Sequence, residues 1–448
     1  MVTYQDLEKL NEDEVMTFVR ETIGKHKASK EYREADIAEQ YNKKRNKTII
    51  DYQKLLYTVT GEAVPDNWSA NFKLCSNFFN RFVTQENQYL LGNGVQWEEE
   101  TTSDKLGKDF DTQLQDAGEK ALVHGVSFGF WNMDHLEVFS FLEFAPLFDE
   151  ETGALKAGIR FWQIDASKPL RATLYELDGY TDYIWRPGED GQVLNEKRSY
   201  NLTIKGTDID GMEIVDGENY KTFPIVPLYG NKQKQSEFVG MRENIDCYDL
   251  IKSGFANDLD DASQIYWILQ GAGGMDDIDL AKFTERIKTT RAAVVEGGVH
   301  AESHTQEVPY ASREAMLARL RSDLFEDAQA LDVREIAAGA TTATQIRAAY
   351  EPLNSKCDKY EYCIIEFINN ILDLVGIEDK PTFTRSAIVN TNEEVGMILQ
   401  AAQYLEPTYV TEKILNLLGD GDRAEEMIKQ MLANQVQALE AQEEEGEV

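Results

Sequence analysis

Apolar side chains recur at every third or fourth position through most of residues 1–120, and this spacing predicts helices. The segment 71–95 illustrates the pattern, because its apolar residues fall near one helical stripe and Gly92 and Gly94 follow as helix stops. The stripe consists of Phe72, Phe79, Phe82 and Leu90. The N-terminal quarter of the chain is therefore expected to be helical.

The period of the pattern changes between residues 123 and 230. Here the apolar runs are short, aromatic and β-branched, and turn signals separate them. The turn signals are Asp178-Gly179, residues 187–192, Asp210-Gly211 and Asp216-Gly217. Asp-Gly between short apolar runs is typical of antiparallel hairpins. Pro224 and Pro227 near the end of this region exclude a central strand there, because proline lacks the N–H that a central strand needs.

Two long helices are predicted on either side of a small insertion. Residues 243–270 keep a three-to-four spacing that corresponds to a helix of about 40 Å. Residues 272–310 read as a short helix followed by strands that turn at Gly297-Gly298, and a second long helix follows to residue 331. The order of these three parts indicates a stalk with a tip.

A run of small residues precedes the next helix. Residues 332–345 have the character of a loop, and a helix is predicted from about Thr342 to Val375. Pro352 lies inside that helix and is expected to kink it, because proline removes one backbone hydrogen bond. Beyond it we expect a strand in 380–388, helices in 392–439 and an acidic, unstructured tail in 440–448.

The composition narrows the class of protein. The chain has 448 residues and a net charge of −35, from 80 acidic and 45 basic residues. It is long enough for two or three domains, and its charge should repel free nucleic acid and anionic membrane. The net charge has two interpretations. It reflects a solvated acidic surface, or it belongs to a protein that works beside a polyanion without binding it tightly. The absence of a signal peptide or an 18-residue apolar run, with four scattered cysteines, predicts a cytosolic product with reduced thiols.

Motifs for catalysis or metal binding are missing from the sequence. It contains no G-x-x-x-x-G-K-[ST], no H-E-x-x-H and no G-x-S-x-G. His300 and His304 are four residues apart in a predicted strand and turn, with no third ligand nearby. The "GDGD" of residues 419–422 lacks the terminal glutamate of a calcium loop and is read as a turn. We therefore expect no catalytic residue, no metal and no cofactor, although 80 carboxylates leave a paired-carboxylate hydrolase open as an alternative.

The order of these segments resembles the portal proteins of tailed double-stranded-DNA bacteriophages, over roughly residues 220–432. The resemblance rests on "PIVPLYGN" (224–231), the polar segment 232–271, the insertion 289–309, the segment 313–332, "IAAGATTATQIRAAYEPL" (336–353) and residues 382–402. Residues 1–220 resemble the family only in their pattern of helices followed by sheet. The individual motifs are soft, since none is a strict catalytic signature.

The resemblance implies an α+β protein with the portal fold: a helical and β wing, two long stem helices, a small α/β clip, a kinked tunnel helix and a helical crown. The implied parts are wing 1–242, stem helix 243–271, clip 272–310, stem helix 311–331, tunnel loop 332–345, kinked helix and wing strand 346–388, crown 389–439 and tail 440–448.

The resemblance also implies a ring, normally of twelve subunits, at one capsid vertex, after assembly in the host cytoplasm. Its implied partners are the terminase large subunit, the major capsid and scaffolding proteins, a head–tail adaptor and double-stranded DNA that passes through without sequence readout. No membrane is involved, and the ATP chemistry belongs to the terminase. The hypotheses kept beside this one are an acidic cytosolic hydrolase and another ring-forming phage adaptor protein.

Two sets of residues acquire expected roles from the resemblance. The tunnel loop would place small side chains beside DNA, and its residues are Ala338, Gly339, Ala340, Thr341, Thr342 and Thr344. Thr341 or Thr342 is alternatively a helix N-cap, and both roles are compatible. The clip would present basic residues to the terminase or adaptor, namely Lys282, Arg286, Lys288 and Arg291. Two alternatives stay equally open: these basic side chains contact a neighbouring subunit, or they face solvent.

Overall fold

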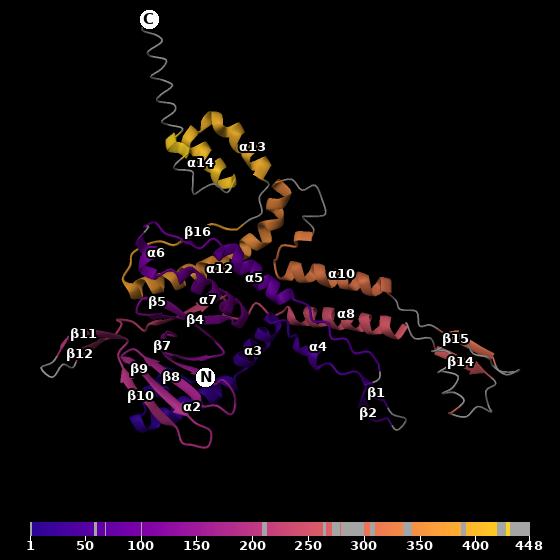
Figure 1. The fold of residues 1–448 in the computed structure, drawn as a ribbon, viewed down its shortest axis with the longest axis horizontal. Helices are drawn as coiled ribbons and strands as arrows, with labels where there is room; N and C mark the ends of the chain where they lie inside the picture. Colours follow the sequence, from indigo (N-terminus) through magenta and orange to yellow (C-terminus); the bar gives the residue numbers. More distant parts are fainter. Residues whose placement is uncertain are drawn as a thin grey trace, which may run out of the picture.

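The computed structural model describes residues 2–57, 61–67, 69–99, 101–207, 213–262, 266–270, 278, 300–304, 310–334, 343–386, 391–418 and 427–430. Helices and strands form a mixed body, from which two long helices extend side by side (Figure 1). A small pair of strands lies beyond the ends of those helices, and a separate group of helices lies above the body.

The N-terminal region is helical, as predicted. Its helices are α1 (Tyr4–Glu8), α2 (Glu12–Lys27), α3 (Lys30–Asn42), α4 (Lys47–Asp51), α5 (Phe78–Leu91), α6 (Thr101–Leu106) and α7 (Phe110–His124). Three short strands interrupt them: β1 (Leu55–Tyr57), β2 (Ala63–Pro65) and β3 (Val95–Gln96). The stripe predicted from Phe72 is wrong at its start, because α5 begins only at Phe78 and Phe72 lies in an extended segment. That segment bonds to another helix rather than to itself, as described below.

The β part consists of antiparallel hairpins, as predicted. A five-stranded sheet has the order β10-β9-β8-β7-β6, and a three-stranded sheet has the order β13-β4-β5. Their bounds are β4 (Val126–Asn132), β5 (His135–Ser140), β6 (Phe144–Phe148), β7 (Leu155–Trp162), β8 (Leu170–Glu176), β9 (Gly179–Trp185), β10 (Gln192–Arg198) and β13 (Ile225–Tyr229). Pro227 lies in β13, which is an edge strand, so its missing N–H leaves no gap in the sheet.

One of the turn signals is misplaced. Asp178-Gly179 stands at the β8–β9 hairpin, where Gly179 pairs with Glu176 and has a φ of 140°. Asp216-Gly217, by contrast, lies inside β12 (Glu213–Glu218), which pairs with β11 (Asn201–Thr207). The backbone partner across the hairpin holds these two residues extended, which overrides their turn preference.

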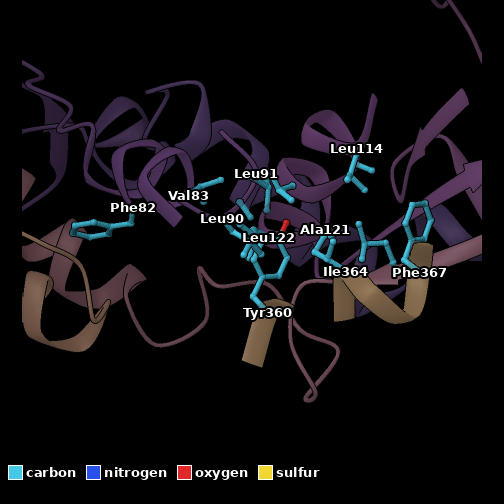
Figure 2. Packing of buried hydrophobic residues seen from close by; sticks show 14 of the residues in the cluster. Phe82, Val83, Leu90, Leu91, Leu114, Ala121, Leu122, Tyr360, Ile364 and Phe367 are labelled. Carbon is cyan, nitrogen blue, oxygen red and sulfur yellow. The ribbon is translucent and has the colours of Figure 1, made fainter. Parts of the chain in front are cut away.

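The largest core cluster is built from α5, α7 and α12 (Ala343–Val375). Figure 2 shows its side chains, with Leu90 and Leu91 of α5 near Leu122 of α7 and Tyr360 of α12. Gly118 of α7 allows this packing, because a Cβ there would come within 2.2 Å of the Tyr360 hydroxyl oxygen. Two further clusters lie under the β sheets, one of them against α2.

The two long helices are α8 (Arg242–Ala262) and α10 (Tyr310–Asp327), and they pack along each other. The prediction of one helix through residues 243–271 is wrong at its C-terminal end. Residues Tyr266–Gln270 form β14, which pairs antiparallel with β15 (His300–His304). Tyr, Trp and Ile favour strands, and the partner that completes the ladder is about thirty residues away in sequence. The helix predicted for 311–331 ends at Asp327.

The remaining described elements follow the predicted order. After α12 come β16 (Thr382–Phe383), paired with β3, then α13 (Thr391–Ala401), the 3-10 turn Ala402–Tyr404 and α14 (Pro407–Leu418). Residues 427–430 are also helical. The predicted strand in 380–388 and helices in 392–439 are therefore confirmed for the residues that are described. The tail 440–448 lies outside them.

Candidate channel and assembly site

A polar stripe on α8 holds the extended segment 69–77. Three buried side chains of α8, four residues apart, accept hydrogen bonds from alternate backbone N–H groups of the segment. These bonds run from Ser76 to Asp249 (2.8 Å), from Leu74 to Ser253 (3.0 Å) and from Phe72 to Asn257 (2.7 Å). Four helical residues rise about 6 Å and two extended residues about 6.6 Å, so the two repeats stay in register. We call this arrangement the polar zipper.

The zipper is closed at one end by α4 and the turn before it. The side-chain amide of Asn46 donates to the Ser76 carbonyl at 3.2 Å and also to the Asp249 carboxylate. Burial raises the pKa of Asp249, while the hydrogen bonds from Asn46 and Ser76 oppose that rise. The result is a fixed attachment of α4 and the extended segment to the base of α8.

The α8–α10 pair is also tied together by polar side chains. Arg313 of α10 forms an ion pair with Asp258 of α8, and the Asn244 amide donates to the Asp327 carboxylate at 3.0 Å. These contacts lie near opposite ends of the pair, so the two helices are joined along their length. An antiparallel pair of this kind can carry a small domain at its far end without a wide base.

Residues 335–342 lie outside the described residues, but the chain on both sides of them is fixed. Leu331, before this segment, packs in one buried cluster with Tyr350 and Leu353, which follow it. Tyr89 of α5 belongs to the same cluster, and its hydroxyl donates to the Asn354 amide oxygen at 2.6 Å. The two ends of the small-residue segment are thus brought close together.

Two polar contacts reinforce the end that precedes the segment. The Gln85 side chain of α5 exchanges two hydrogen bonds with the backbone of Leu331, at 2.9 and 3.2 Å. The Arg321 guanidinium binds both carboxylate oxygens of Asp332 at 2.8 and 2.9 Å. The chain therefore leaves α10 in a defined direction.

A buried group of three charges joins α12 to the rest of the body. The ammonium of Lys356 lies 2.7 Å from Oε2 of Glu86 in α5 and 3.0 Å from Oε2 of Glu237, in the connection between β13 and α8. It also donates to the carbonyl of Ala328, just after α10, at 3.3 Å. One side chain of α12 thus contacts α5, the connection that leads into α8 and the chain just after α10. We call this group the Lys356 junction.

Burial sets the protonation of this junction. It raises the pKa of Glu86 to about 7, although the charge of Lys356 acts in the opposite direction. Burial opposes the charge of Lys356 as well, but the two carboxylates outweigh it and raise the pKa of the ammonium. The lysine is therefore charged over the whole physiological range, while Glu86 titrates near neutrality.

The predicted site residues fare differently. Thr344 lies exposed near the start of α12, and Pro352 lies exposed inside α12, as expected from the sequence. The kink at Pro352 stays a prediction. Five tunnel-loop residues, Ala338, Gly339, Ala340, Thr341 and Thr342, lie outside the described residues. The four clip residues, Lys282, Arg286, Lys288 and Arg291, do as well.

Sequence reasoning missed the zipper and the junction. Asp249, Ser253 and Asn257 carry a readable signal, because polar residues at spacings of four form a stripe on a helix. Glu86 and Lys356 carry no such signal, since they come from segments 270 residues apart. Their pairing depends on how α5 and α12 pack.

Possible metal ligands can be located in the described part of the chain. Over those residues, no group of three His, Cys, Asp or Glu side chains is placed to hold a metal ion. His300 and His304 stand at the two ends of β15. Within the same described ranges, no helix combines the length and apolar character needed to cross a membrane.

Comparison with known proteins gives the class of protein. Residues 20–441 match the family described as phage portal protein, SPP1 Gp6-like. The chain belongs to this family of phage portal proteins. This result favours the portal interpretation over the hydrolase and adaptor hypotheses, since the match covers most of the chain.

Individual relatives are distant. The portal protein of Clostridium phage phiCD119 is 24% identical over 246 residues, which are 53% of this chain and 54% of that protein, so the match spans about half the relative's length. The portal protein of Bacillus phage SPP1 is 23% identical over 386 residues, 78% of this chain and 73% of that protein.

Two solved structures match the chain at low TM-scores. One is the neck of an empty GTA particle computed with C6 symmetry, with a TM-score of 0.43 and 12% identity over 76% of this chain and 90% of that one. The other is the virion of a native gene transfer agent particle, with a TM-score of 0.44 and 13% identity over 76% of this chain and 89% of that one.

Proposed function

We propose that this chain is one subunit of a portal ring, normally of twelve copies, at one vertex of a phage capsid. Its role is structural rather than enzymatic: the ring conducts double-stranded DNA during packaging and ejection. The observation that carries the proposal is the pair α8 and α10, which leads directly into a small-residue segment with both ends anchored. Membership of the portal family supports it.

In this proposal the tunnel loop is the part of the chain nearest to DNA. Residues without bulk let the backbone approach the double helix, and a glycine such as Gly339 permits dihedrals that other residues resist. Thr341, Thr342 and Thr344 offer contacts to phosphate that carry no sequence information. The net charge of −35 fits this role, because a channel dense in lysine would hold DNA through counterion release.

The segment 272–310 is proposed as the clip that binds the terminase large subunit and later the head–tail adaptor. The wing and crown face the major capsid and scaffolding proteins, and the ring assembles in the host cytoplasm before it becomes part of the virion. ATP hydrolysis belongs to the terminase, so the chain needs no cofactor of its own.

The first test is the native mass of the purified full chain, with electron micrographs of the same sample. Rings of about twelve subunits with an axial hole are expected. A chain that stays monomeric, even when it is produced together with its capsid and scaffolding proteins, would rule out the ring.

A second test addresses the clip. A chain that lacks residues 272–310 is expected to remain soluble, because α8 and α10 keep their mutual contacts. It is expected to lose terminase binding, because the proposed binding segment is removed. A finer test keeps the full chain and reverses the charge at Lys282, Arg286, Lys288 and Arg291, which should also weaken terminase binding. Motor binding that survives the deletion would remove the clip assignment and leave the ring proposal intact.

A further inference from the structure

The hairpin β1–β2 is an arm that exposes apolar side chains. We define the arm as residues 52–57 and 61–67. Leu55, Leu56 and Val64 are all exposed, and Tyr52 just before them is exposed as well. In Figure 1 the hairpin projects from the body on the same side as α8 and α10, away from the β sheets. Apolar side chains gathered on a projecting element mark an interaction surface more often than a solvent face.

The arm has no buried face of its own. Leu55 pairs with Pro65 and Leu56 pairs with Val64, so successive pairs place apolar residues on both faces of the hairpin. The strand β2 is exposed at all three positions. A two-stranded hairpin is marginal in water without a surface to pack on. Packing against a partner surface would therefore bury apolar side chains and stabilise the arm.

The base of the arm is held firmly. The polar zipper fixes the segment that follows the arm, and α4, which precedes it, packs on α8. The Lys73 ammonium also donates to the carbonyl of Ile50, which joins the two segments across the base. The arm thus leaves the molecule from a fixed position beside its own α8 and is directed outward.

The segment that leads into the arm and the long helices carry opposite charge. Residues 43–54, which lead into the arm, contain five basic residues and one acidic residue in a chain with a net charge of −35. The helix α8 has six acidic and two basic residues. Exposed apolar side chains, Leu259, Tyr310 and Met316, lie toward the far end of the α8–α10 pair. That pair therefore offers an acidic and apolar surface to an apolar arm whose leading segment is basic.

We propose that the arm packs on the α8–α10 pair of a neighbouring copy of this chain. This inference rests on the proposed ring and identifies one of its subunit contacts. A contact between two different surfaces of identical chains is heterologous, and such contacts form a ring when the rotation between subunits closes. The arm of each subunit is one side of the contact, and the long helices of the next subunit are the other.

The first experiment replaces arm residues in the full chain. The variant Leu55→Glu/Leu56→Glu is expected to raise the chain concentration needed for ring assembly at least tenfold, measured by native mass spectrometry across a dilution series. Leu177→Glu, in the β8–β9 turn, is the matched control, because Leu177 is 48% exposed and Leu55 is 47% exposed. Circular dichroism checks that both variants are folded.

Charge is tested separately. Lys44→Glu/Lys47→Glu is expected to weaken assembly and to flatten its dependence on salt, because the attraction between arm base and acidic helices is screened. The same reversal at the exposed Lys25 and Lys27, on α2, is the control.

The second experiment locates the partner surface. Benzoylphenylalanine replaces Leu56 in an isotopically light chain, which is mixed with a heavy chain before irradiation. Light-to-heavy adducts that map to residues 242–262 or 310–327 are expected. Adducts confined to one chain, or adducts elsewhere on the neighbour, overturn the arm contact.

The outcomes separate the two proposals. Rings that assemble normally from the Leu55→Glu/Leu56→Glu variant overturn the arm contact and leave the ring standing. A wild-type chain that never associates with another copy overturns both. Light-to-heavy adducts on the two helices, together with weakened assembly of the arm variant alone, support both.

Discussion

The ammonium of Lys356 lies 2.7 Å from Oε2 of Glu86, and the Glu86 side chain is only 3% exposed. With Glu237 as a second partner, this one lysine connects α12, α5, the entry to α8 and the exit from α10. All parts that surround the small-residue segment 335–342 therefore meet at the Lys356 junction. A change in this junction should affect the position of that segment without touching it.

Lys356→Met is expected to lower the free energy of unfolding by about 3–5 kcal/mol, because it leaves the buried Glu86 and the partly buried Glu237 without their counterion. Lys359→Met is the control, since Lys359 lies one turn further along the same helix and is exposed. Denaturant unfolding at matched chain concentration measures both. Equal effects of the two substitutions would mean that the junction contributes nothing specific.

Glu86 should make the stability depend on pH near neutrality. Its pKa is about 7 in the folded chain and about 4.5 when exposed, so the folded state binds the proton more tightly. The contribution of Glu86 to the free energy of unfolding is therefore full below about pH 4.5 and is lost as the pH rises through about 7. The free energy of unfolding of Glu86→Gln, taken relative to that of the wild type, should therefore rise by on the order of 1–3 kcal/mol between pH 5 and pH 7.5. Unfolding curves of both proteins across this range measure the difference, and a flat difference would contradict the titration.

The polar zipper is expected to stabilise the arm and α8 together. Asn257→Ala removes the acceptor of the Phe72 N–H and should cost about 1–2 kcal/mol, since that group is left without its partner. Amide hydrogen exchange should speed up at Phe72 and Leu74. Glu243→Ala, at an exposed position of the same helix, should change neither quantity. Unchanged exchange at Phe72 in Asn257→Ala would show that the zipper does not hold the segment in solution.

Gly339→Trp tests the tunnel-loop proposal. We expect normal rings, because residue 339 lies outside the arm and outside both long helices, but DNA packaging should fall at least tenfold. Gly24→Trp is the control, since a Cβ at this exposed helical position meets no atom within 4 Å. Packaging is measured as protected DNA per particle. Full heads from Gly339→Trp would remove the segment from the DNA path.

The errors in the sequence-based fold have a common origin. The segment from Phe72 was predicted as the start of a helix, and Tyr266–Gln270 as the end of one, because both continue an apolar spacing of three to four. In the structure Phe72 donates its N–H to Asn257, and Tyr266–Gln270 pairs with His300–His304. In each case a distant partner satisfies the backbone better than the local helix would.

The sequence by itself determined the class of each region and the family. Helical spacing in the N-terminal region, hairpin signals after Val126, two long helices around an insertion and a small-residue run before α12 were all readable, because these are local patterns. The tertiary structure alone decided the Lys356 junction, the zipper partners and the exposure of the arm. These depend on which segments meet in space, and burial then fixes the charge state of groups such as Glu86 that look ordinary in the chain.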